Sequence, residues 1–93
     1  MPKYLIGREL QGAGKLSAQE LHAISAKSND VLREMRGEGE NIQWVESYVT
    51  DNAITCLYVA ANPEQLMEHA RRGGFPCTNV QRVDTVIDPT TGE

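Results

Sequence analysis

Hydrophobic and polar residues alternate in two adjacent runs in the middle of the chain, Ile42–Thr50 and Ala53–Ala60. Alternation with a period of two is typical of β-strands. The two residues between the runs, Asp51 and Asn52, tolerate the positive φ of a tight turn and therefore favour a hairpin. Counting outward from this turn without interruption predicts a register that reaches Trp44 opposite Val59.

This register divides the hairpin into two faces, because directly opposed residues project from the same side of a sheet. One face is expected to carry Val45, Ser47, Val49, Ile54, Cys56 and Tyr58. The other is expected to carry Trp44, Glu46, Tyr48, Thr55, Leu57 and Val59. Both are too apolar to lie bare in water, and a chain of 93 residues contains helix enough to cover only one. We therefore expect a second copy of the chain to cover the face with Trp44.

Two other segments have the signature of helices. The segment Ser17–Glu20 is a capping box, and apolar residues follow it at helical spacing as far as Met35, before Gly37. The segment Asn62–Gln65 predicts a second helix start, with a capping Asn, a Pro at the first helical position and Gln65 completing the box. The pair Gly73-Gly74 is expected to end this helix.

The remaining strands are predicted at Lys3–Leu10 and Val80–Ile87, with residues 88–93 as a polar tail. The element order is then βαββαβ, which indicates an α+β ferredoxin-like domain over residues 1–93. Right-handed crossovers favour a four-stranded antiparallel sheet of order 4-1-3-2 with both helices on one face. A pair of such domains would form a dimeric α+β barrel. The pattern leaves open whether Tyr4, Ile6 and Arg8 or the residues between them face inward.

Charge and composition exclude several classes of function. The net charge of −4 argues against a nucleic-acid partner, because phosphate binding needs clustered Lys and Arg. No apolar run approaches the ~20 residues of a membrane helix, and the start of the chain has no signal-peptide pattern, so we expect a cytoplasmic protein. The predicted sheet order separates Cys56 from Cys77 by about 10 Å, too far for a disulfide, and predicts two free thiols.

The most suggestive polar residue is Glu46, which the register places between Trp44 and Tyr48. A carboxylate in an apolar cavity must be paired, protonated or bound to a cation. We interpret these three residues as a candidate ligand-binding group, with Glu46 as a metal ligand or a base. The alternative is that Glu46 forms an ion pair with Arg8 or Arg82 across the sheet or the interface.

Two further side chains have ligand chemistry. His69, on the second helix, is either a metal ligand or proton shuttle, or a partly buried histidine bonded to a backbone carbonyl. Cys56 is expected on the helix-covered face, where a cysteine usually behaves as a small hydrophobe. No arrangement of nucleophile and base can be assigned from the sequence, so no catalytic residue is predicted.

Four stretches together resemble a family of small bacterial proteins classed as a domain of unknown function: Lys3–Ile6, Trp44–Val49, Cys56–Ala60 and Glu68–Pro76. The resemblance implies a dimeric ferredoxin-like fold. Some members of that family are nickel-binding, nickel-responsive proteins, so it also implies nickel or another divalent transition metal as a cofactor. Relatives often carry Glu and His where this chain has Gly7 and Arg8. The matching positions with ligand chemistry are Glu46, His69 and Cys56.

Two hypotheses for function result. The first is a non-enzymatic homodimer that binds a metal ion or a small ligand at the open face of the sheet. The second is a dimeric α+β-barrel enzyme, an isomerase or cofactor-independent monooxygenase acting on a small hydrophobic compound, with Glu46 or His69 as the base. The second requires an apolar pocket of about 300 Å³ or more.

Overall fold

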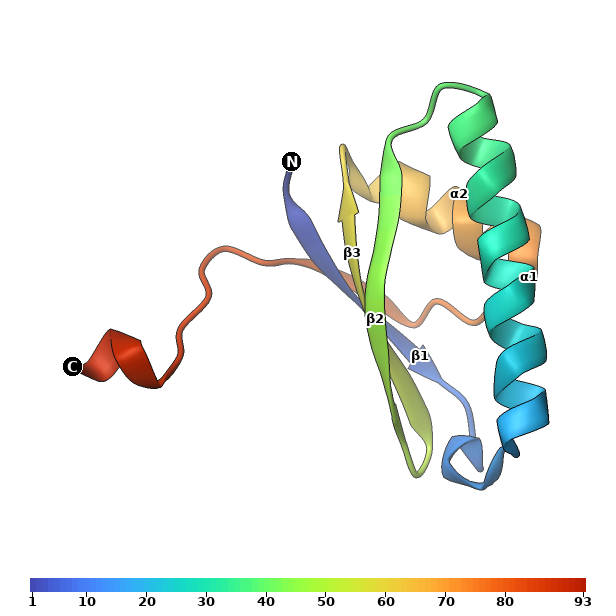
Figure 1. The fold of residues 1–93 in the computed structure, drawn as a ribbon, viewed down its shortest axis with the longest axis horizontal. Coiled ribbons are helices and arrows are strands. Elements are labelled where there is room, and N and C mark those ends of the chain that lie inside the picture. The colour runs from blue at the N-terminus through green and yellow to red at the C-terminus, as the bar shows by residue number, and fades with distance from the viewer.

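The computed structural model describes residues 1–93 as a four-stranded antiparallel sheet covered on one side by two helices (Figure 1). In chain order the elements are β1 (Lys3–Glu9), η1 (Ala13–Lys15), α1 (Ala18–Gly37), β2 (Ile42–Thr50), β3 (Ala53–Ala60), α2 (Pro63–Gly73), β4 (Asn79–Arg82) and η2 (Pro89–Gly92). The sheet order is β2-β3-β1-β4, and every neighbouring pair is antiparallel. The predicted α+β ferredoxin-like topology is therefore confirmed.

The two long helices begin at the predicted caps. The Ser17 hydroxyl accepts from the Glu20 amide while the Glu20 carboxylate accepts from the Ser17 amide, so the first capping box is confirmed. At α2 the Asn62 side chain caps the Gln65 amide, as predicted. The Gln65 side chain, however, does not complete a box. It accepts from the Ala61 amide and donates to the Glu40 carboxylate at 2.6 Å, because the loop after α1 lies within its reach.

The side of the sheet under the helices, here called the helix face, holds the hydrophobic core. The structure decides the orientation of β1: Tyr4, Ile6 and Arg8 point toward the helices and are buried. The rest of the core cluster comes from both helices, β2, β3 and η1: Ala13, Val31, Leu32, Met35, Ile42, Ile54, Cys56, Tyr58, Ala60 and Leu66. The opposite side of the sheet is called the open face, because no element of this chain covers it (Figure 1).

The predicted hairpin register is correct from the turn to Glu46 and wrong beyond it. A β-bulge between Trp44 and Glu46 pairs Trp44 with Tyr58 instead of Val59. The bulge moves Trp44 from the predicted open face to the helix face, where its ring packs against the core and its Nε1 donates to the Ser47 Oγ at 2.9 Å. Val45 is correspondingly 52% exposed. Burial of the largest side chain in the strand outweighs the regular alternation.

The last strand is shorter than predicted. β4 ends at Arg82, opposite Tyr4, and the Val83 amide makes a final bond to the Lys3 carbonyl. Because β1 begins at Lys3, no partner strand remains for the residues after Val83. Val86 and Ile87 are 66% and 76% exposed, and the segment extends away from both the sheet and the helices (Figure 1). The predicted polar tail contains η2, whose start is capped by the Asp88 carboxylate.

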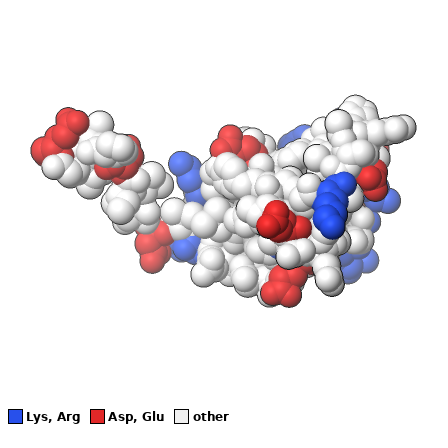
Figure 2. All heavy atoms as spheres, turned by 90° about the horizontal axis from the view of Figure 1, so that it is seen from below, with Lys and Arg blue, Asp and Glu red and all other residues white.

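Charged side chains are scattered over the surface. On the face shown in Figure 2, separate groups of Lys and Arg and of Asp and Glu are mixed among uncharged residues, and acidic groups lie on the projecting C-terminal segment. Neither helix combines the length and the apolar character that crossing a lipid bilayer requires.

Candidate functional site

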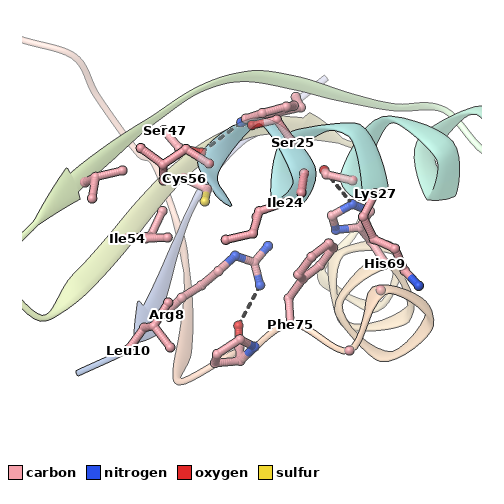
Figure 3. A pocket seen from close by; sticks show the side chains of 18 of the residues that line it. Arg8, Leu10, Ile24, Ser25, Lys27, Ser47, Ile54, Cys56, His69 and Phe75 are labelled. Carbon is pink, nitrogen blue, oxygen red and sulfur yellow. Dashed lines mark hydrogen bonds between the residues drawn. The ribbon is translucent and has the colours of Figure 1, made fainter. Parts of the chain in front are cut away.

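A cavity of about 480 Å³ lies on the helix face, between α1, the sheet and the segment that follows α2 (Figure 3). The register predicted from the sequence places the candidate ligand-binding residues Trp44, Glu46 and Tyr48 on the other side of the sheet, the open face. The cavity opens here because the first half of α1 does not fully cover the strands beneath it. Its apolar walls include Leu10, Leu21, Ile24, Val49, Ile54 and Phe75, and its polar groups include Arg8, Ser28, Ser47, Cys56, Tyr58 and His69.

The strongest electrostatic feature of the cavity is Arg8, the third inward side chain of β1. It is only 6% exposed. Its Nη1 donates to the Pro76 carbonyl at 2.7 Å, and its guanidinium carbon lies 5.6 Å from the centre of the Phe75 ring. Neither contact neutralises the charge, and no Asp or Glu lines the cavity. Burial of an unpaired charge is unfavourable, so this arrangement marks a specialised site rather than ordinary core packing.

His69 reaches the same cavity from α2 and is 1% exposed. Its Nε2 lies 3.1 Å from the Ser28 Oγ, and its ring packs between Tyr58 and Phe75 with centroid separations of 5.5 and 5.4 Å. Its Nδ1 has no hydrogen-bond partner. Burial, and secondly the positive charge of Arg8, lower the pKa of His69 to about 4. The imidazole is therefore neutral at neutral pH.

The turn after α2 places the aromatic part of the site. Gly74 has φ of 71°, a left-handed conformation that suits glycine, and the Phe75 amide returns to the Ala70 carbonyl at 2.9 Å. A Cβ at Gly73 would clash with the Phe75 ring, so the ring packs directly on Gly73. The segment Gly73–Pro76 thus brings the Phe75 ring and the Pro76 carbonyl to Arg8.

The structure separates the residues that the sequence groups together. Glu46 and Tyr48 lie on the open face, where the Tyr48 hydroxyl donates to the Glu46 carboxylate. Trp44, Cys56 and His69 line the cavity on the helix face. Within the chain Glu46 forms no ion pair. The predicted alternative pairing with Arg8 across the sheet of one chain is wrong, because these two side chains lie on opposite faces.

The donor set of one chain does not fit a nickel ion. No three side chains of His, Cys, Asp or Glu gather at any point in the structure. The cavity offers two such residues, Cys56 and His69, and places the positive Arg8 in the same wall. A divalent cation there would meet charge repulsion and would lack the further ligands that it needs.

Both cysteines are free, as predicted. Cys56 is buried beneath α1 and Cys77 is exposed in the loop before β4. Sequence reasoning did not identify Phe75 or Ser28 as part of a site, and it treated Arg8 only as a counter-ion. The sequence feature that could have identified Phe75 is the run of two glycines, an aromatic residue and a proline at 73–76. Such a run ends the helix in a tight turn and places the aromatic ring next to the helix end.

Comparisons with known proteins agree with this fold. A family model described as nickel responsive protein SCO4226-like matches residues 4–83. The crystal structure of SCO4226 from Streptomyces coelicolor A3(2) is similar, with a TM-score of 0.75 over 91% of this chain and 99% of that chain, at 15% sequence identity. At this identity the likeness shows the fold alone. No curated protein matches the sequence.

Proposed function

The chain belongs to the SCO4226-like family of nickel responsive proteins, and we propose that it is a non-enzymatic protein that binds a small ligand in the cavity beside Arg8. The observation that carries this proposal is the cavity itself. A volume of about 480 Å³, apolar walls and a few polar groups are the usual features of a small-molecule site.

Binding is favoured over catalysis by the state of His69. A general base works best with a pKa near the working pH. Burial and Arg8 lower the pKa of His69 to about 4, so it is a weak proton acceptor in neutral solution. Glu46, the other candidate base, lies on the opposite face of the sheet from the cavity. The cavity therefore lacks a base suited to the alternative enzyme function.

Occupancy of the cavity can be tested with the neutral fluorescent probe N-phenylnaphthylamine. Ser25 lines the cavity from α1, and a Ser25→Phe variant should occupy part of it and weaken probe binding. Ala26 is its exposed neighbour outside the cavity, so Ala26→Phe adds the same ring to the same helix as a matched control and should bind as the parent does. Absence of saturable binding by the parent protein, or equal binding by both variants, would refute the proposal.

We also propose that the protein works as a homodimer through the open face. Leu5, Leu57 and Val59 are half-buried there although no element covers them, and Tyr48 is 46% exposed. The extended segment with Val86 and Ile87 projects beyond the sheet and has no cover from its own chain (Figure 1). A second copy would bury both apolar surfaces, and a domain this small gains much from such burial.

Sedimentation equilibrium tests the dimer. The expected mass is twice the 10.3 kDa of one chain. Leu57→Arg places a charge in the centre of the open face and should yield monomer. Met67→Arg makes the same change at an exposed apolar residue of α2 and should leave the dimer intact. A mass of 10.3 kDa for the parent protein at high micromolar concentration would rule the dimer out.

The family description supports a second candidate function, the binding of nickel. Because the donors of one chain do not suffice, such a site would need both subunits, and a dimer through the open face would bring two Glu46 carboxylates to one interface. Calorimetric titration with Ni²⁺ tests this. Glu46→Gln should abolish the heat, whereas Cys56→Ala, on the other side of the sheet, should retain it. No heat from the parent protein would exclude nickel binding.

A further inference from the structure

We propose that the ligand of the cavity is a small amphipathic carboxylate whose charged group pairs with Arg8. This inference rests on the proposed function and specifies its ligand class. The apolar body of the ligand would pack against the cavity walls formed by Leu21, Ile24, Trp44 and Ile54. Ile24 and Ile54 are labelled in Figure 3.

The charge balance of the cavity carries the inference. Arg8 is only 6% exposed, and none of the residues around the cavity is acidic. The second cation of the lining, Lys27, is exposed. This locally positive site lies within a protein whose net charge is −4. Buried arginines are normally paired with carboxylates, so the partner that the chain does not supply is expected from the ligand.

The hydrogen-bonding capacity of Arg8 agrees with this. A guanidinium carries five N–H donors in a planar fork. One of them donates to the Pro76 carbonyl through Nη1, and the neutral side chains of Cys56 and Tyr58 lie close to the same group without supplying a negative charge. That bond and the Phe75 ring hold the plane of the group in place. The unused donors suit a carboxylate, which accepts two parallel N–H bonds from such a fork.

A second unsatisfied polar atom belongs to His69, another residue of the cavity wall. The Nδ1 of the buried His69 has no partner, while its Nε2 is hydrogen-bonded to Ser28. In the tautomer in which Ser28 donates to Nε2, the proton lies on Nδ1, which is then a donor without an acceptor. His69 thus adds a second unpaired polar group beside Arg8 and supplies no negative charge that could pair with the guanidinium.

The number of charges favours a monocarboxylate over a phosphate. One buried cation neutralises one negative charge, and a phosphate dianion would bring an excess charge among apolar walls. Those walls instead suit an alkyl or aromatic body. A carboxylate with a short hydrocarbon chain therefore fits both halves of the cavity.

The fluorescence of Trp44, the only tryptophan of the chain and part of the cavity wall, offers a direct measurement. The parent protein is titrated with octanoate, with its neutral analogue octanamide and with inorganic phosphate. We expect octanoate to bind at least about tenfold more tightly than octanamide, as one charge-assisted pair provides. Phosphate should produce no saturable change.

Two variants test whether the positive charge that binds octanoate is that of Arg8. Arg8→Met keeps an unbranched side chain without charge and should weaken octanoate binding about tenfold or more while leaving octanamide unaffected. Arg33→Met removes an exposed arginine of α1 that pairs with Asp30, and should change neither. If Arg8→Met fails to fold, the comparison of octanoate with octanamide on the parent protein still decides the question.

The outcomes separate the two proposals. Equal affinity for octanoate and octanamide, or binding of N-phenylnaphthylamine without any binding of octanoate, would overturn the carboxylate inference and leave the proposed ligand site standing. Failure of octanoate, octanamide and N-phenylnaphthylamine alike would overturn both. An octanoate preference that persists in Arg8→Met would show that another group recognises the anion, and would also overturn the inference.

Discussion

The Ser28 hydroxyl of α1 and the Nε2 of His69 on α2 lie 3.1 Å apart in a buried side-chain contact between the two helices. The contact fixes the orientation of the imidazole, which in turn packs between Tyr58 and Phe75. One serine on the first helix thus helps to determine the shape of a cavity whose other walls come from the sheet and from the end of the second helix.

Stability should depend on pH through His69. Its pKa is about 4 in the folded protein, against 6.5 for an ordinary histidine, because of burial and the nearby charge of Arg8. Between these two values the unfolded chain binds a proton that the folded chain does not, so the free energy of unfolding rises with pH across the window. Acidification from pH 6.5 to 4 should therefore lower the free energy of unfolding by roughly 3 kcal/mol.

Urea unfolding at a series of pH values measures this loss. His69→Gln should flatten the pH dependence between 6.5 and 4, whereas His22→Gln, at an exposed position, should retain it. An unchanged slope in His69→Gln would contradict the assignment.

The close packing of Phe75 on Gly73 predicts a steric effect. In Gly73→Ala the new Cβ would clash with the Phe75 ring, so the ring must leave its place beside Arg8 and His69. We expect the free energy of unfolding to fall by about 1–3 kcal/mol. Gly37→Ala, at the end of α1 with no atom within 4 Å, is the matched control and should not destabilise. Equal stabilities of the two variants in urea would show that the ring does not hold this position.

An ion network at the helix ends predicts coupled carboxyl pKa values. Arg72 of α2 contacts Glu34 of α1 and Glu38, the residue that caps the end of α1, at 2.8 Å each, and it contacts Glu68 of its own helix at 2.6 Å. Hydrogen bonds from Arg71 and then Arg72 lower the pKa of Glu68 to about 2, and Arg72 also lowers that of Glu38. The stability that these carboxylates contribute is present above their ordinary pKa and is lost as the pH falls toward the lowered values.

NMR titration of the carboxyl carbons separates the two arginines. Arg72→Gln should raise the pKa of both Glu38 and Glu68 toward ordinary values. Arg71→Gln should raise the pKa of Glu68 alone, because Arg71 contacts only its own helix. An unchanged pKa of Glu38 in Arg72→Gln would mean that the link between the helices does not persist in solution.

The two thiols should differ in reactivity. Cys77 is exposed in a loop, and Cys56 is 4% exposed beneath α1. In the folded protein a disulfide reagent such as dithionitrobenzoate should modify one thiol rapidly, and the second only on unfolding. Cys77→Ser should remove the rapid phase and Cys56→Ser should retain it. Rapid modification of both thiols would contradict the burial of Cys56.

The order and type of the elements could be predicted from the sequence because they depend on local interactions. The capping residues Ser17 and Asn62 satisfy backbone groups within a few residues of themselves, and the turn at Asp51 and Asn52 sets the register of the strands next to it. The succession βαββαβ then allows few topologies. The strand end at Arg82 could not be predicted in this way, because it depends on where β1 begins.

The sequence by itself determined the helices, the hairpin and the topology, since each follows from spacing along the chain. Only the tertiary structure decided which faces the polar residues occupy. Packing of Trp44 against the core introduces the bulge, and packing of Tyr4 and Ile6 under the helices carries Arg8 into the interior. A polar side chain within a strand follows the orientation that its apolar neighbours impose. For this reason Arg8, His69 and Phe75, which are far apart in the sequence, meet in one cavity, while Glu46 lies on the other side of the sheet.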